Sequence, residues 1–187
     1  MSRGRKRKPG KRYPSGKRMP DALQHEVLST VLDARRRHHG VTRSQARDHR
    51  LGTALGRLAF REAITPEQHQ AGEQFAALVH HHNVVRGLPL PHPRSVTGLL
   101  DREGIFGGSS ADPDPWLLDR LRRRYAEATA ALNRCDREQQ CAVGMKPSRL
   151  VRDVACAEED LQWTDGRLDR LRSGLDVLAE LFGIVSQ

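Results

Sequence analysis

The apolar positions of this chain recur at helical rather than strand spacing along most of its length, which predicts an all-α protein. The first helix is expected over residues 21–39, where Asp21 can cap the N-terminus and Gly40 follows the last turn. One face of this helix carries Leu23, Val27, Val31 and Ala34. Its C-terminal end is crowded with cations, which suit the helix dipole.

Residues 51–87 carry the strongest signals and predict a helical hairpin. A short helix over about residues 53–62 is followed by Thr65-Pro66-Glu67-Gln68, which combines an N-cap Thr, a Pro at the first position and a Gln at the third. The second helix is expected to run to Arg86 and end at Gly87. The pair resembles a helix-turn-helix, but its second helix begins with little positive charge, so a packed hairpin is favoured over a recognition helix.

The remainder of the chain predicts a linker and a C-terminal bundle. Residues 88–113 are rich in Pro and Gly, with one short helix expected over Val96–Arg102. Residues 114–187 predict three amphipathic helices, starting at Asp114, near Pro147 and at Thr164 or Asp165. The first and third have apolar seams with alternating steps of three and four, so an antiparallel three-helix bundle is expected. The seams are Leu118, Leu121, Tyr125, Ala128, Leu132, Cys135 and Leu168, Leu171, Leu175, Leu178, Phe182.

Charge separates the first twenty residues from the rest. They hold nine Lys and Arg and no acid, whereas the remaining chain has 23 bases and 23 acids, so the net charge of +9 comes from this segment. Like-charge repulsion together with its Pro and Gly residues predicts a disordered basic arm. The predicted organisation is therefore an arm (1–20), an N-terminal helical region with the hairpin (21–87), a linker (88–113) and the bundle (114–187).

The basic arm is the main candidate for function. Mobile cations bind phosphates through counterion release, and Arg forks also stack on bases. We expect residues 1–18 to contact DNA or RNA through Arg3, Arg5, Lys6, Arg7, Lys8, Lys11, Arg12, Lys17 and Arg18, with Tyr13 available for stacking. Arg43, Arg47 and Arg50 are expected to add phosphate contacts. The alternatives are an acidic protein or membrane patch, and a passive solubilising arm.

The other polar clusters do not predict catalysis, a metal or a cofactor. His80-His81-His82 are neighbours on a helix and point about 100° apart, so they are expected at different faces. Three cysteines without a CxxC pair favour a reducing cytoplasm, with Cys135 and Cys156 in structural roles. No apolar run is long enough to span a membrane. An enzyme would need a polar pocket that gathers His and carboxylate side chains from separate helices.

Three segments resemble a group of small proteins encoded in phages and prophages of alphaproteobacteria. These segments are RKPGKRYPSGKR, RDHRLGTALGRLAFREAITPEQHQAGEQFAALV and LRSGLDVLAELFG. They cover the arm, the hairpin and the last helix, but not the linker or the helix at 114–141. The resemblance implies a phage context and no defined activity, so it assigns no functional residue.

Together these observations favour a non-enzymatic nucleic-acid-binding accessory protein, phage-derived, with a regulatory or DNA-packaging role. The alternative is a helical adaptor or oligomeric scaffold that binds a helical partner or a second copy through its seams, with the arm only localising it.

Overall fold

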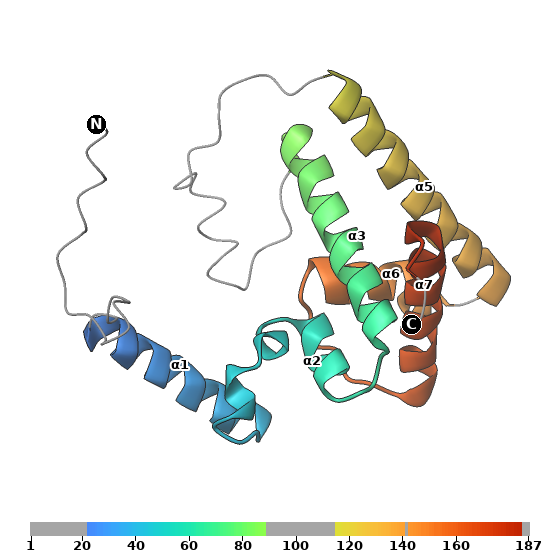
Figure 1. Cartoon of the computed structure of the whole chain (residues 1–187). Coiled ribbons are helices and arrows are strands. Elements are labelled where there is room, and N and C mark those ends of the chain that lie inside the picture. Colours follow the sequence, from blue (N-terminus) through green and yellow to red (C-terminus); the bar gives the residue numbers. More distant parts are fainter. Residues whose placement is uncertain (1–21, 89–114, 141, 185–187) are drawn as a thin grey trace, which may run out of the picture. The chain divides into compact units, whose positions relative to one another are not determined.

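The computed structural model describes residues 22–88, 115–140 and 142–184, and these residues form helices and no strand (Figure 1). The predicted all-α class is confirmed. The chain divides into two compact units, Met1–Asp48 and His49–Gln187. The predicted arm, the short helix expected at Val96–Arg102 and almost all of the predicted linker lie outside the described residues.

The described part of the first unit consists of one long helix and a short turn of 3-10 helix. Helix α1 spans Ala22–His39, close to the expected bounds, and η1 spans Gln45–Arg47. Gly40 follows α1 with a φ of 64°, a left-handed conformation that suits glycine at a helix end. Leu32 of α1 and Ala46 of η1 are buried, whereas the large apolar side chains of Val27, Leu28 and Val31 in α1 are exposed.

The second unit begins with the predicted hairpin. After η2 (His49–Gly52), α2 spans Ala54–Phe60 and α3 spans Pro66–Val85. The expected start of α3 is confirmed as a capping box. The Gln68 backbone N–H donates to Thr65 Oγ1 at 3.2 Å, and the Thr65 N–H donates to Gln68 Oε1 at 2.9 Å. Since two otherwise unpaired donors are satisfied here, the turn between the helices is fixed.

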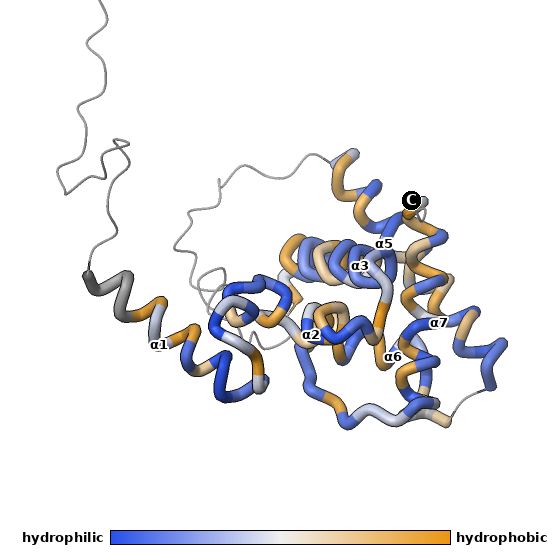
Figure 2. Tube along the Cα trace, turned by 60° about the horizontal axis from the view of Figure 1, so that its bottom comes forward, coloured by the Kyte–Doolittle hydropathy of each residue, from blue (hydrophilic) through white to orange (hydrophobic). Residues whose placement is uncertain are grey.

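The C-terminal part contains two long helices and a short helical segment between them. Helix α5 spans Pro115–Gln139, α6 spans Pro147–Val151, and α7 spans Asp165–Phe182, with Gly183 left-handed after it. A turn of 3-10 helix, η3 (Val143–Met145), precedes α6, and a π-helical turn, η4 (Arg152–Cys156), follows it. Figure 2 shows hydrophobic and hydrophilic residues alternating along α5 and α7, as their seams predicted.

The structure corrects the predicted division between the hairpin and the C-terminal bundle. One hydrophobic core contains residues of α2, α3, α5, α6, η4 and α7, among them Phe75, Leu132, Val151 and Leu175. The second helix of the expected three-helix bundle starts at Pro147 as predicted, but it ends in the π turn at Cys156. Because this second helix is so short, α3 is the long helix that packs on both α5 and α7 (Figure 1).

Candidate nucleic-acid interface

Formal charge is distributed unevenly between the two units. The first unit contains fourteen Lys and Arg and four acids, a net charge of +10, whereas the second contains eighteen and nineteen, a net charge of −1. Nine of the fourteen bases belong to the predicted arm, which lies outside the described residues. The other five are Arg35, Arg36, Arg37, Arg43 and Arg47. The neutral total for the chain after residue 20 therefore conceals a second basic cluster, which we call the α1–η1 cluster.

The α1–η1 cluster follows the end of α1 onto the next segment. Arg36 and Arg37 lie in the last turn of α1, and both are exposed. Arg37 Nε donates to the backbone oxygen of Asp33 at 3.3 Å, one turn earlier. Cations at this end of a helix are favoured by its dipole, so the same residues stabilise α1 and present positive charge to solvent.

Hydrogen bonds within the segment after α1 hold the backbone that carries Arg43 and Arg47. The Thr42 N–H and the Thr42 hydroxyl both donate to Gln45 Oε1, at 3.0 and 2.9 Å. The Ala46 N–H donates to the Thr42 carbonyl at 2.9 Å, and Ala46 is buried. Arg43 and Arg47 are exposed on either side of this turn, so two of the predicted phosphate contacts lie on an ordered backbone.

Arg50, which the sequence grouped with them, belongs to the second unit. It is half-buried in η2, and its guanidinium carbon lies 5.6 Å from the ring centroid of Phe60. A cation at this distance is attracted to the aromatic face, so Arg50 also connects η2 to α2. Its role includes packing, which the sequence analysis did not predict.

The burial of the hairpin is that of an element packed into the core rather than that of a recognition helix. Helix α3 contains no Lys or Arg, and its exposed side chains near the start include Gln70, Glu73 and Gln74. Arg57 of α2 forms an ion pair with Asp160 at 2.5 Å. A recognition helix needs a cation-supported face to enter a groove of DNA, and α3 has no Lys or Arg to supply one.

A second exposed cationic surface lies on the first half of α5, where the sequence analysis identified only the apolar seam. Trp116 is 63% exposed, and the guanidinium carbon of Arg120 lies 5.5 Å from its ring centroid. A hollow of about 290 Å³ is lined by Trp116, Asp119, Arg120, Arg123, Arg124 and Glu127. The run Arg122-Arg123-Arg124 after Trp116 was the sequence signal that could have identified it. We call this surface the Trp116 patch.

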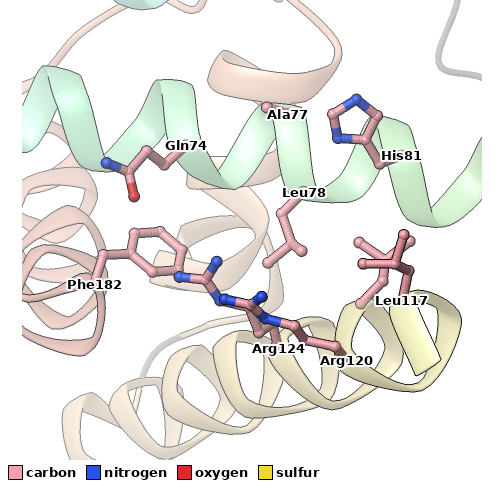
Figure 3. A pocket seen from close by; sticks show the side chains of 9 residues that line it. Gln74, Ala77, Leu78, His81, Leu117, Arg120, Arg124 and Phe182 are labelled. Carbon is pink, nitrogen blue, oxygen red and sulfur yellow. The ribbon is translucent and has the colours of Figure 1, made fainter.

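An apolar groove of about 380 Å³ lies beside the Trp116 patch, between α3, α5 and the end of α7 (Figure 3). Leu78, Leu117, Leu121 and Phe182 line it, and the other lining residues are Gln74, Ala77, His81, Arg120 and Arg124. Arg120 and Arg124 line both hollows, and Figure 3 shows them extending from α5 towards Phe182. These two arginines therefore separate an apolar surface from an aromatic and cationic one.

The three consecutive histidines lie in different environments, as helix geometry predicted. His81 is exposed at the rim of the groove, whereas His82 is only 6% exposed. The His82 ring stacks on Tyr125, with centroids 3.8 Å apart and planes at 8°, so it joins α3 to α5. Within the described part of the chain, no group of three His, Cys, Asp or Glu side chains is arranged to hold a metal ion.

The described cysteines are free thiols inside or beside the core. Cys135 is buried on the seam of α5, and Cys156 is half-buried at the end of η4. Burial raises the pKa of the Cys156 thiol to about 12, because the thiolate would lose its hydration there. Cys156 packs against the hydrophobic core, and the raised pKa disfavours the thiolate, which is the nucleophilic form.

Within the described ranges, no helix combines the length and the hydrophobicity needed to cross a bilayer. Comparison of the chain with protein-family models, with curated proteins and with solved structures found no match.

Proposed function

We propose that this chain is a nucleic-acid-binding accessory protein of phage origin, without catalytic activity of its own. The observation that carries the proposal is the charge separation: +10 in the first unit against −1 in the second. Nucleic acids are the polyanions whose binding such a cluster favours through counterion release. In this proposal the first unit binds DNA or RNA phosphates in the cytoplasm, and the second serves a regulatory or DNA-packaging role.

The α1–η1 cluster extends the proposal beyond the arm. Arg43 and Arg47 rest on a hydrogen-bonded turn, and Arg36 and Arg37 lie at the end of a helix. Cations on ordered backbone lose less conformational freedom when they bind than cations on a loose chain. The cluster should therefore orient the nucleic acid, while the arm adds charge and affinity.

Salt dependence tests this proposal directly. If all fourteen bases of the first unit contacted phosphate, log K would fall against log salt with a slope of about −13 on duplex DNA, an upper limit. Fluorescence polarisation with labelled single- and double-stranded DNA and RNA measures the slope for the full-length chain. Replacing the five arginines of the α1–η1 cluster with Gln should reduce it by at most about 4 to 5.

A matched control removes the same charge from the second unit. Arg61, Arg86, Arg134, Arg137 and Arg152 are exposed, and replacing them with Gln also removes five positive charges. This control should leave the slope nearly unchanged, although it lowers the net charge equally. Equal effects of the two sets would show that total charge alone matters, and no binding by the wild-type chain at low salt would overturn the proposal.

The alternative function, a helical adaptor or scaffold, has a different observation in its favour. The seams of α5 and α7 are mostly used inside the second unit, since Leu132, Leu171, Leu175 and Leu178 are buried. Of the other seam residues, Leu121 and Phe182 are half-buried and line the apolar groove. Helix α1, however, exposes Val27, Leu28 and Val31. Light scattering distinguishes the two functions: a stable oligomer abolished by changing these three residues to Ser would favour the scaffold.

A further inference from the structure

The groove between α3, α5 and the end of α7 is an apolar surface beside the core that stays open to solvent (Figure 3). Four large apolar side chains line it: Leu78, Leu117, Leu121 and Phe182. Leu117 is 52% exposed, and the other three are half-buried. Because apolar side chains are unfavourably hydrated, a group of them around a hollow of about 380 Å³ points to a surface that another molecule covers.

The groove continues the apolar seams of α5 and α7 beyond the part that the core covers. Leu132 of α5 and Leu178 of α7 are fully buried. Leu121 and Phe182 lie on the same two seams, at the groove, and are only half-buried. Seam positions pack best when a neighbouring helix covers them, so the groove suits one more helix beside α3, α5 and α7.

The rim of the groove is cationic. Arg120 and Arg124 lie one turn apart on α5, and Figure 3 shows both extending towards Phe182. His81 lines the α3 side, and none of the described residues that line the groove is Asp or Glu. Arg120 also lies 5.5 Å from the Trp116 ring, which leaves its charge in place. The groove is therefore locally positive on a unit with a net charge of −1, and it favours an occupant with carboxylates beside its apolar side chains.

We propose that this groove binds an amphipathic helix of a partner protein. The apolar side chains of the partner, at positions i, i+4 and i+7, enter the groove, and its Asp or Glu side chains lie opposite Arg120 and Arg124. Insertion of a helix into an apolar groove is a recurrent mode of recognition, and its anchors follow this spacing. The inference goes beyond nucleic-acid binding, because it gives the second unit a protein partner of its own.

Other occupants suit the groove less well. An extended peptide that adds to a sheet edge has no strand to pair with in the described ranges. Nucleic acid gains little from four large apolar side chains, because its outer surface is charged phosphate. A second copy could offer the exposed apolar face of α1, but that helix ends in Arg36 and Arg37, and the cationic rim would repel them.

Synthetic helical peptides test the inference on the full-length chain. A labelled probe of about 18 residues carries Leu at i, i+4, i+7 and i+11 with Glu beside them, and two variants carry Lys in place of Glu or Ser in place of Leu. Fluorescence polarisation at about 0.15 M salt, which screens the arm, should show the Leu/Glu peptide binding at least about tenfold more tightly than either variant. The Ser/Glu peptide keeps every carboxylate, so it measures attachment to the basic first unit alone.

Substitutions in the groove should act on the Leu/Glu peptide selectively. Leu117→Glu places an acid in the groove at an exposed position and should weaken binding at least about tenfold. Leu181→Glu is the matched control, since Leu181 is 41% exposed on α7 and does not line the groove. It adds the same charge and should change the affinity less than about twofold. Circular dichroism melting should be nearly unchanged in both variants, because neither side chain is in the core.

A charge reversal on the rim tests the acidic character of the partner. Arg124→Glu should weaken binding of the Leu/Glu peptide about tenfold and strengthen binding of the Leu/Lys peptide by a similar factor, because the favoured sign of the flanking charge is reversed. Arg134→Glu, at an exposed position of α5 outside the groove, makes the same change of charge and should have neither effect.

The outcomes separate this inference from the proposed function. If the Leu/Glu peptide does not bind the wild-type chain, or binds no better than the Ser/Glu peptide, the inference fails. Light scattering that shows an oligomer dissociated by Leu117→Glu would assign the groove to a second copy, which also overturns it. If Arg124→Glu weakens oligonucleotide binding and leaves the peptide unaffected, the rim belongs to a nucleic-acid site instead. Nucleic-acid binding by the first unit is measured without the peptides, so it stands or fails independently of these results.

Discussion

The two units of the chain hold charge and core in opposite proportions. The first has a net charge of +10, and its described part contributes two of the buried apolar residues, Leu32 and Ala46. The second has a net charge of −1 and contributes the other eighteen of the buried apolar residues in the described ranges. The residues available to attract a polyanion are therefore not those that hold the fold together. Binding and stability should respond to different substitutions.

The largest effect should come from the core of the second unit. Leu175 of α7 is fully buried, and Leu175→Ala is expected to lower the free energy of unfolding by about 2–5 kcal/mol, through lost burial and the cavity left behind. Urea denaturation followed by circular dichroism measures it. Leu117→Ala, at an exposed site, should change the free energy of unfolding by no more than about 0.5 kcal/mol.

Urea denaturation also tests whether the charge of the first unit is separate from the stability of the second. Replacing the five arginines of the α1–η1 cluster with Gln should change the free energy of unfolding of the second unit by no more than about 0.5 kcal/mol, because surface charges contribute little to stability. A loss as large as that of Leu175→Ala would mean that the charge of the first unit also supports the core, and the separation between the units would not hold.

The sequence predicted helices and caps well, because these depend on neighbouring residues. The capping box at Thr65 and Gln68 and the end of α1 before Gly40 were predicted from local patterns alone. The placement of α3 was not predicted, since an apolar helix face does not show which other helix it packs against. Its contacts with α5 and α7 depend on α6 being short, and nothing in Pro147-Ser148-Arg149-Leu150 shows that a π turn follows.

The candidate site was predicted in part for the same reason. Arg43 and Arg47 were identified from composition, and the structure places both on an exposed turn. The Trp116 patch was missed because the seam analysis of α5 considered only its buried face. Exposure of Trp116 is a tertiary property, which the local sequence of α5 does not specify. The arm, the strongest sequence signal, lies outside the described residues.

A smaller effect should come from backbone contact within the second unit. A Cβ at Gly174 of α7 would lie 2.9 Å from Val151 Cγ2 and 3.2 Å from Pro147 Cβ, so this glycine lets α6 approach α7 closely. Gly174→Ala is expected to lower the free energy of unfolding by about 1–3 kcal/mol through overpacking. Differential scanning calorimetry or urea denaturation measures the loss.

Gly166, on the same helix, is the matched control. A Cβ there meets nothing within 4 Å, so Gly166→Ala should instead stabilise α7 by up to about 1 kcal/mol through helix propensity. If the two substitutions change the free energy of unfolding in opposite directions, the loss at Gly174 is caused by close packing rather than by the loss of a glycine as such. Equal signs would contradict the described contact between α6 and α7.

The smallest predicted effect concerns a single carboxylate at the start of α3. The Thr65 side chain hydrogen-bonds to Glu67 and, with the Glu67 backbone N–H, lowers the pKa of that carboxyl below its ordinary value of 4.5. Thr65→Ala should raise the pKa of Glu67 towards that value, and Thr65→Ser, which keeps the hydroxyl, should leave it low. NMR titration of the Glu67 side chain measures both.

The sign of the linkage follows from the lowered pKa. The hydrogen bond contributes stability above about pH 4.5, and this contribution is lost as the pH falls through the folded-state pKa of Glu67. Because the cause is a local hydrogen bond rather than a distant field, added salt should change this pKa little, whereas binding of nucleic acid by the first unit should weaken steeply. A salt-sensitive Glu67 would instead indicate that the field of the basic first unit reaches α3, and the electrostatic separation of the two units would fail.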